Sequence, residues 1–591
     1  MFKRLGLVMI VLFLLPTLAL AQNMSTGVAA MARYFPANTV FFAAVRTDDD
    51  FLKLLDSLSQ PAFQMAQAAG QPVTSLSQQL NMLLGEMNTN LDTVKAWLGD
   101  RAAIGATPAA LASGSDTTLQ GVYAVIEVSD AAGAEAFMKS ALPSFYRTQK
   151  QGDYTVFTNS GAPTTSATIA ISANLMVIYV GNGSTPLPTD GTSLESSADF
   201  QAAVGALSAA PYFSVLYADP SVIAQHVPLE PTGKMTLDTA PLAVGLTIQD
   251  GRSFILDTAQ LAIKGATVAA PGVIDSDFAN YIPGSASGVI HATDLTTLYN
   301  TLINFADSMN TSSQSPLPST QVEQVLSALG VNLKTDLLSW TTGDYALFYR
   351  TDIVDLAASA MTGAAPDLKG LGNKFDFGLV IQATDPAKAQ ALATHLGALL
   401  KQMVASQQDV SVQDDTIGGV KVTTLSLSVP VDQQNTLQIN IALGATKDVF
   451  FLATRPAAEM IINGDGILSG NSGYIEAQRD LLPNPTFVWY ADGEGLVDAV
   501  AVSAIVPLAL LGPAIGNIYS NIVNNLDEGS PGSFSTPTPL PSPTRAVPAV
   551  DSATLIAELK SSIKAVSSSS ISSTVTKDGV TLFRFVVTSA Q

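Results

Sequence analysis

A run of apolar, β-branched and aromatic residues introduced by proline occurs twice in the chain. Residues 34–48 read YFPANTVFFAAVRTD, and residues 281–294 read YIPGSASGVIHATD. Each run predicts a buried strand, because strands favour these residue types, and each ends in an Asp that can cap a following helix. The return of this pattern almost half a chain later predicts an internal duplication.

Further landmarks recur in the same order in the two halves. Three predicted strand segments recur, at 123–130 and 378–385, 175–180 and 449–453, and 211–219 and 485–492. Trp97 and Trp340 each precede a Gly-Asp turn, and we interpret both as core anchors. Each half closes on an Asp-Gly pair between apolar runs, Asp250-Gly251 and Asp578-Gly579, which predicts a hairpin.

The spacing of apolar residues indicates how each half folds. Apolar residues take every second position in 425–429 and 439–443, the period of strands with one buried face. Leucines at helical spacing predict helices after the first strand, and regular βαβ alternation is lacking. The sequence therefore predicts an α+β fold of two tandem, duplicated modules, residues 22–270 and 271–591. Each module is predicted to be an antiparallel β-sheet backed by helices on one face.

The second half carries an insertion at about 499–550 that the first half lacks. Its first part, 499–516, is apolar and uncharged, and its second part, 530–548, is rich in Pro, Ser and Thr and predicts an extended linker. Pro507 and Pro513 disfavour a transmembrane helix. The remaining interpretations are a helical hairpin buried on the sheet, and an apolar flap that covers a ligand groove or touches membrane lipid through 499–518. The candidate flap residues are Ile505, Val506, Leu508, Leu510, Leu511 and Ile515.

Residues 1–21 have the pattern of a secretory signal peptide. Lys3 and Arg4 precede an apolar core, and a small-x-small motif ends at Ala21. The apolar core is shorter than the span that an uncleaved membrane anchor needs. We therefore expect export to the periplasm, the cell surface or the medium, with cleavage after Ala21. The chain has no Cys, which excludes disulfides, thiol catalysis and thiolate metal sites.

Charge excludes one class of partner. Charged residues make up 13% of the chain, the formal net charge is −21, and no dense basic run follows the N-terminus. Nucleic-acid binding needs clustered Lys and Arg, so we expect no nucleic-acid partner.

Candidate catalytic and metal-binding residues have simpler structural interpretations. Aspartates follow predicted strands at Asp48, Asp130, Asp219, Asp294, Asp385 and Asp492. Helix capping explains them better than metal binding, and Pro220 and Pro386 suit the first helical position. The three histidines, His226, His291 and His395, lack metal-ligand spacing, and no nucleophile elbow, Walker motif or dinucleotide motif is present. The sequence therefore predicts no catalytic, cofactor or metal site.

The opening strand also carries a family resemblance. Pro36-Ala37-Asn38-Thr39, leading to Arg46-Thr47-Asp48, resembles an uncharacterised family of exported bacterial proteins defined by a domain of unknown function. In that family Pro-Ala-Asp/Asn-Thr begins the first strand, and the second copy departs from it at Gly284-Ser285-Ala286. The resemblance implies no known activity, substrate or catalytic residue.

The sequence favours an exported, non-enzymatic envelope or surface protein that binds a ligand, lipid, polymer or partner protein. A structural or adhesive spacer and a secreted hydrolase with a site invisible in the sequence are the alternatives. An apolar cavity beneath 499–516 would favour the first, and a nucleophile close to a base in a cleft would favour the hydrolase. The sequence leaves the oligomeric state open.

Overall fold

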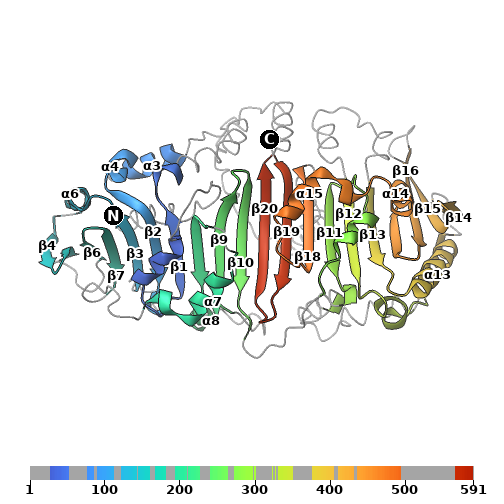
Figure 1. Ribbon diagram of the computed structural model, residues 1–591, viewed down its shortest axis with the longest axis horizontal. Coiled ribbons are helices and arrows are strands. Elements are labelled where there is room, and N and C mark those ends of the chain that lie inside the picture. The colour runs from blue at the N-terminus through green and yellow to red at the C-terminus, as the bar shows by residue number, and fades with distance from the viewer. Residues whose placement is uncertain are drawn as a thin grey trace, which may run out of the picture.

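The fold is known from a computed structural model, in which one antiparallel sheet of 20 strands dominates (Figure 1). The structure describes residues 27–589 apart from 52–75, 86–88, 112–120, 143, 160–166, 182–192, 209–210, 227–239, 264–271, 297–298, 301–322, 324–326, 328–329, 351–375, 405–409, 431–435, 494 and 496–565.

The strand order shows how the two halves of the chain are arranged. From one edge, the first ten strands are β4 (Tyr146–Gln151), β5 (Tyr154–Asn159), β6 (Ala167–Ile171), β7 (Leu175–Val180), β3 (Val122–Val128), β2 (Leu98–Ala106), β1 (Phe41–Arg46), β8 (Ser214–Ala218), β9 (Leu242–Gln249) and β10 (Ser253–Gln260). The sheet continues with β20 (Thr581–Ser589), β19 (Val566–Val575), β18 (Phe487–Asp492), β11 (Gly288–Thr293), β12 (Asp344–Arg350), β13 (Asp376–Gln382), β17 (Val449–Thr454), β16 (Thr436–Ala445), β15 (Val420–Pro430) and β14 (Val410–Ile417). The second ten strands thus repeat the order of the first ten, reversed across the β10–β20 pair.

The prediction of two separate α+β modules is wrong. β10 and β20 pair antiparallel from Ser253 opposite Thr588 to Gln260 opposite Thr581, so one continuous sheet runs through both halves. Each closing hairpin would otherwise leave a row of unpaired backbone N–H and C=O groups at its edge. Apolar periodicity reveals which face of a strand is buried and carries no information about what pairs with its edge. That is why the sequence could not show the junction.

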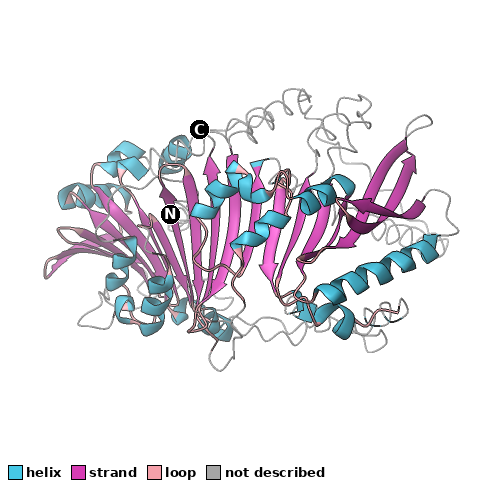
Figure 2. Ribbon diagram, turned by 45° about the vertical axis from the view of Figure 1, so that its right-hand side comes forward, coloured by secondary structure: helices cyan, strands magenta, loops and turns pink. Residues whose placement is uncertain are grey.

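Helices cover both faces of this sheet, and not one face as predicted (Figure 2). We call one side the α15 face; it carries α7 (Ala198–Ala206), α14 (Arg455–Asn463), α15 (Ser472–Arg479) and the short helices η1 (Val28–Tyr34), η2 (Leu194–Ser196), η3 (Ser276–Tyr281) and η5 (Leu468–Gly470). We call the other the α13 face; it carries α4 (Leu91–Lys95), α6 (Ala131–Ala141), α13 (Pro386–Val404) and the π-helical turn η4 (Leu333–Leu338). The remaining described helices are α3 (Leu76–Gly85), α5 (Pro108–Leu111) and α8 (Pro220–His226).

Local chemistry follows the sequence predictions closely. Aspartate side chains accept hydrogen bonds from backbone N–H groups at the start of the next segment at Asp48, Asp130, Asp219, Asp385 and Asp492. Asp294 differs, with a left-handed φ of 56°. The Asp-Gly hairpin between β9 and β10 is confirmed: Asp250 and Gly251 have φ values of 52° and 69°, the positive angles that a type I′ turn requires.

Both predicted core tryptophans are buried, Trp97 to 4% exposure and Trp340 to 1%. Trp340 also donates a hydrogen bond from Nε1 to the carbonyl of Asp336, at 2.7 Å. Within the described residues no helix is long and apolar enough to cross a membrane.

Candidate binding surface

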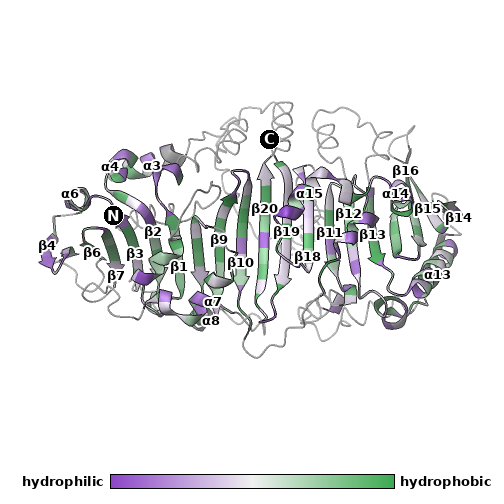
Figure 3. Ribbon diagram, in the orientation of Figure 1, coloured by the Kyte–Doolittle hydropathy of each residue, from purple (hydrophilic) through white to green (hydrophobic). Residues whose placement is uncertain are grey.

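Eight large apolar side chains stand in register on the α13 face, one on each of eight neighbouring strands. In order across the sheet they are Leu256, Phe585, Ile571, Trp489, Ile290, Leu347, Leu379 and Leu452, which we call the apolar strip. Neighbouring strands lie about 4.8 Å apart, so the strip is about 34 Å long. Figure 3 shows apolar residues on these central strands. The strip crosses the junction, because Leu256 belongs to the first half and the other seven residues to the second.

The strip is accessible, unlike the opposite faces of the same strands. Leu347 and Leu452 are 44% and 39% exposed, and the other six side chains are half-buried. Val289, Phe348 and Val380, which point to the α15 face, are at most 2% exposed. Leu347 and Leu452 flank the half-buried Leu379 in one register row, and together the three form an apolar surface of the kind that marks binding sites on folded proteins.

The first half has a matching row that is more covered. The strand order places Ala43, Ile104, Ala124 and Ile178 where the second half has Ile290, Leu347, Leu379 and Leu452. Ile104 is half-buried, and the other three residues are 7–8% exposed. Phe137 and Met138 of α6 belong to the core cluster that contains Ala124 and Ile178. The second half therefore has larger side chains at two of the four positions, and it leaves Leu347 and Leu452 more accessible than their counterparts Ile104 and Ile178.

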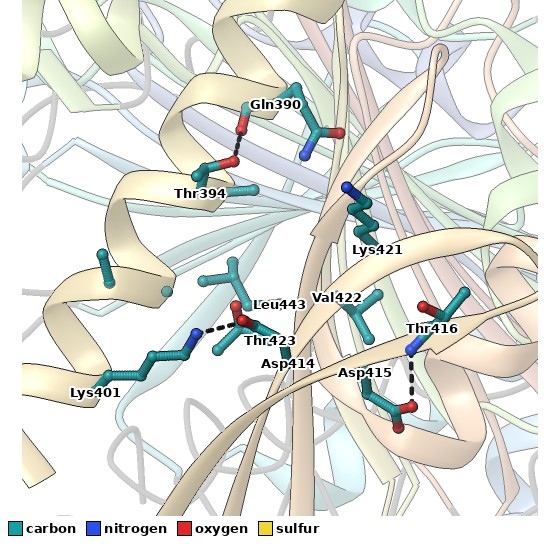
Figure 4. A pocket seen from close by; sticks show the side chains of 13 residues that line it. Gln390, Thr394, Lys401, Asp414, Asp415, Thr416, Lys421, Val422, Thr423 and Leu443 are labelled. Atoms are coloured by element: carbon teal, nitrogen blue, oxygen red, sulfur yellow. Dashed lines mark hydrogen bonds and ion pairs between the residues drawn. The ribbon is translucent and has the colours of Figure 1, made fainter. Parts of the chain in front are cut away.

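A groove of about 620 Å³ lies beside the far end of the strip, between α13 and strands β14 to β16 (Figure 4). Helix α13 has 19 residues, whereas its counterpart in the first half, α6, has 11, and the groove lies along the longer helix. Leu443, the register partner of Leu452, lines the groove and is 4% exposed beneath α13. The groove is thus separated from the exposed leucines by the helix.

The acidic residues of the groove are already engaged in ion pairs. Lys401 Nζ of α13 lies 2.6 Å from Asp414 Oδ1, and Figure 4 shows the two side chains pointing toward each other. Arg455 of α14 donates a hydrogen bond to Asp415, which holds the pKa of that carboxyl below its ordinary value. These ion pairs hold the β14–β15 hairpin against α13 and α14. We therefore interpret the groove as the contact region between the hairpin and α13, and not as a binding site.

A buried His–Asp pair lies elsewhere on the sheet. His291 Nε2 is 2.9 Å from Asp344 Oδ2, and both residues are at most 3% exposed. Asp344 Oδ2 also accepts the backbone N–H of Asp275 at 2.8 Å, and the Phe278 ring lies against the imidazole. His291 Nδ1 has no hydrogen-bond partner in the part of the chain that the structure describes, whereas a catalytic triad needs a hydroxyl there. The pair therefore fastens the loop before η3 to the sheet.

Comparison with known proteins places the chain in a family. The family model described as "Protein of unknown function (DUF3352)" matches residues 4–445. The chain belongs to this family. No curated protein and no solved structure matches it. The match confirms that the chain belongs to a family of unknown function, and it includes Leu256, Ile290, Leu347 and Leu379 of the strip.

The candidate sites predicted from the DUF3352 sequence have different outcomes. The six candidate flap residues between Ile505 and Ile515 lie outside the described residues, so that assignment stays a prediction. His395 lies on α13 and His226 ends α8, far along the chain from His291 on β11. No group of three or more potential metal-ligating residues occurs among the residues that the structure covers.

Sequence reasoning missed the apolar strip. The available signal was local: the segments of β11, β12 and β13 are apolar at consecutive positions, which is typical of strands covered on both faces. Only the register between strands shows that the apolar residues on the α13 face line up across the sheet. The exposed fractions of their side chains show that they are accessible.

Proposed function

We propose that this DUF3352 protein is an exported, non-enzymatic binding protein whose apolar strip holds the acyl chain of a lipid-like ligand. The observation that carries the proposal is the register-matched strip with its accessible Leu347 and Leu452. The signal-like residues 1–21 support export to the envelope, the cell surface or the medium.

The shape and chemistry of the strip favour an acyl chain. The strip consists of uncharged side chains in register, and extended hydrocarbon can lie along it over the whole distance between Ile290 and Leu452. Covering the exposed parts of Leu347 and Leu452 stabilises the complex by on the order of 1 kcal/mol each. The formal charge of −21 disfavours lying flat on an anionic bilayer, which favours capture of single lipid molecules.

We also infer that the two halves arose by duplication of one ten-strand module. The reversed strand order across β10 and β20 supports this inference, as do the matching bridges Pro36–Ser193 and Pro283–Ile467. The junction has a functional consequence in this proposal, because it extends the strip from the second half into Leu256.

The first experiment is native mass spectrometry of the mature protein purified from an exporting host, followed by titration with a fluorescent fatty acid. We expect co-purified acyl compounds, an N-terminus at Gln22, and saturable binding. Leu347→Asp and Leu452→Asp should each weaken binding by roughly tenfold or more, because a charge in the strip must be desolvated by the chain.

Ile475→Asp is the matched control. Ile475 is 40% exposed, close to the 39% of Leu452, and lies on α15 on the opposite face of the sheet. It should bind like the wild type. If the protein carries no ligand and the strip variants behave like the control, a structural or adhesive spacer becomes the better interpretation, and binding of an added protein partner would point to a protein-docking surface.

A further inference from the structure

The two outer edges of the sheet carry opposite charge. Among the described strands, β4 pairs with β5 alone and β14 pairs with β15 alone, so these two strands form the edges. They hold corresponding places in the two halves. β4 contributes Arg147 and Lys150, whereas β14 contributes Asp414 and Asp415.

The opposite charges also match face by face. Lys150 lies on the α13 face, with Nζ 3.7 Å from Glu135 of α6, and Asp414 lies on the same face beside α13. Arg147 is displaced by an odd number of residues from Lys150 and so points to the α15 face. Asp415 also points there, toward α14. An antiparallel meeting of the two edges would keep each cation on the same side as an anion.

One register brings several complementary pairs together. Placing Arg147 opposite Asp415 puts Phe145, just before β4, opposite Ile417 and Gln149 opposite Gln413, so that charge meets charge, apolar meets apolar and amide meets amide at these positions. In the same register Thr148 faces Asp414, and Lys150 faces Val412. Lys150 then stands diagonal to Asp414, a separation that long side chains span. Phe145 is 48% exposed, and this register would cover it.

We propose that copies of this chain join edge to edge, β4 of one copy against β14 of the next, and so continue the sheet. The contact is heterologous, since the two edges differ, and in this proposal it propagates as an open assembly, because a heterologous contact whose rotation does not close a ring builds a filament. The chain already contains a junction of this kind, because β10 and β20 are corresponding edges that pair antiparallel. Charges on edge strands ordinarily keep copies apart. Here the strand side chains differ in sign. The contact between copies therefore adds opposite-charge pairs to those that Lys150, Asp414 and Asp415 make with Glu135, Lys401 and Arg455, whereas β4–β4 and β14–β14 pairings set like charges opposite each other.

Sedimentation velocity of the full mature chain at physiological ionic strength, over a wide range of protein concentration, tests the proposal. The wild type should sediment faster as concentration rises, with no single closed oligomer. Arg147→Asp places like charges opposite each other and should raise the apparent dissociation constant roughly tenfold. A chain with both Arg147→Asp and Asp415→Arg restores opposite charges and should assemble again.

Two further measurements separate this interpretation from general charge effects. Lys447→Asp makes the same charge change at a side chain that is 88% exposed away from the edges, and it should assemble like the wild type. Urea denaturation of each variant shows whether it is folded, and the double variant keeps the test valid if Asp415→Arg alone is unstable. A wild type that stays monomeric at every concentration would overturn the proposal, as would assembly by Arg147→Asp at wild-type strength.

Discussion

Asp257 of β10 and Arg584 of β20 lie directly opposite each other at the junction and hold corresponding positions in the two halves. The guanidinium binds the carboxylate through two hydrogen bonds, Nε to Oδ1 at 2.6 Å and Nη2 to Oδ2 at 2.8 Å. Leu216 of β8 and Trp489 of β18 correspond in the two halves. Following the register from Leu216 across β9 leads to Thr258, and following it from Trp489 across β19 leads to Phe585. Asp257 and Arg584 are the residues just before these two, so they correspond as well. The approximate two-fold axis that relates the two halves therefore passes between an acidic residue and a basic one. Two identical halves would place like charges there.

Arg584→Leu should destabilise the protein by about 3–5 kcal/mol, because it leaves a buried carboxylate without its cation. Asp257 is 2% exposed and would keep the hydrogen bond from the Tyr212 hydroxyl, at 2.5 Å. The double variant Asp257→Leu/Arg584→Leu should recover much of the loss, since it removes both buried charges. Urea denaturation measures the free energies of unfolding.

Arg252→Leu is the matched control at the same junction. Arg252 Nη2 lies 3.2 Å from Glu476 Oε1 of α15, with both side chains about one-third exposed. An ion pair this accessible contributes less than about 1 kcal/mol. If Arg252→Leu and Arg584→Leu lowered the free energy of unfolding equally, burial would not be the reason that the Asp257–Arg584 pair matters for stability.

Trp489 should report ligand binding through its fluorescence. It is the half-buried member of the three tryptophans and belongs to the strip, whereas Trp97 and Trp340 are at most 4% exposed in the core. An acyl chain laid on the strip would replace water beside the Trp489 indole, so we expect a blue shift of emission on titration with a fatty acid. Trp489→Phe should abolish the shift while titration by a separate probe still shows binding. A shift that survives in Trp489→Phe would place the ligand elsewhere.

Stability should decline at alkaline pH, because burial raises the pKa of several tyrosines. Burial raises the pKa of Tyr345 to about 12, and burial together with the neighbouring Tyr179 raises that of Tyr123 to about 12. The unfolded chain ionises its tyrosines near pH 10. Above about pH 10 the unfolded state therefore loses protons that the folded state retains, and stability falls as pH rises toward about 12.

Urea midpoints at about pH 8 and about pH 11 test this dependence. Tyr345→Phe keeps the ring in the core and removes the titrating hydroxyl, so the difference between the two midpoints should shrink. An unchanged difference would mean that Tyr345 ionises equally easily in the folded state.

The sequence was sufficient for features that depend on a few neighbouring residues. Caps at Asp130 and Asp385, the type I′ hairpin at Asp250-Gly251 and the burial of Trp340 all follow from local chemistry. Each depends on contacts within one or two elements, where propensity and periodicity act directly.

The junction and the strip depend on contacts across the chain. Asp257 meets Arg584 from 327 residues away, and nothing beside either residue reveals the other. The strip depends on the register of eight strands at once, and a one-residue slip in any strand would turn its leucine or isoleucine to the opposite face. Apolar residues at consecutive positions are compatible with either register, so the sequence alone could not place the strip.

Gly397 of α13 lets the helix approach the sheet closely enough to cover Leu443, which lies next to the end of the strip. A Cβ on Gly397 would lie 2.3 Å from Thr423 Oγ1 and 3.1 Å from Thr423 Cβ. Helix propensity alone predicts that Gly397→Leu stabilises the protein by up to about 1 kcal/mol. The close contact predicts the opposite sign, a loss of about 1–3 kcal/mol as α13 is pushed away from the sheet.

Ala391→Leu provides the comparison, because Ala391 is exposed on the same helix and does not line the groove. It should leave the urea midpoint nearly unchanged. Displacement of α13 in Gly397→Leu should also increase the exposure of Leu443, the register partner of Leu452, so hydrogen exchange of β16 should become faster. A stabilised Gly397→Leu variant with unchanged exchange would show that the helix is not held by this contact.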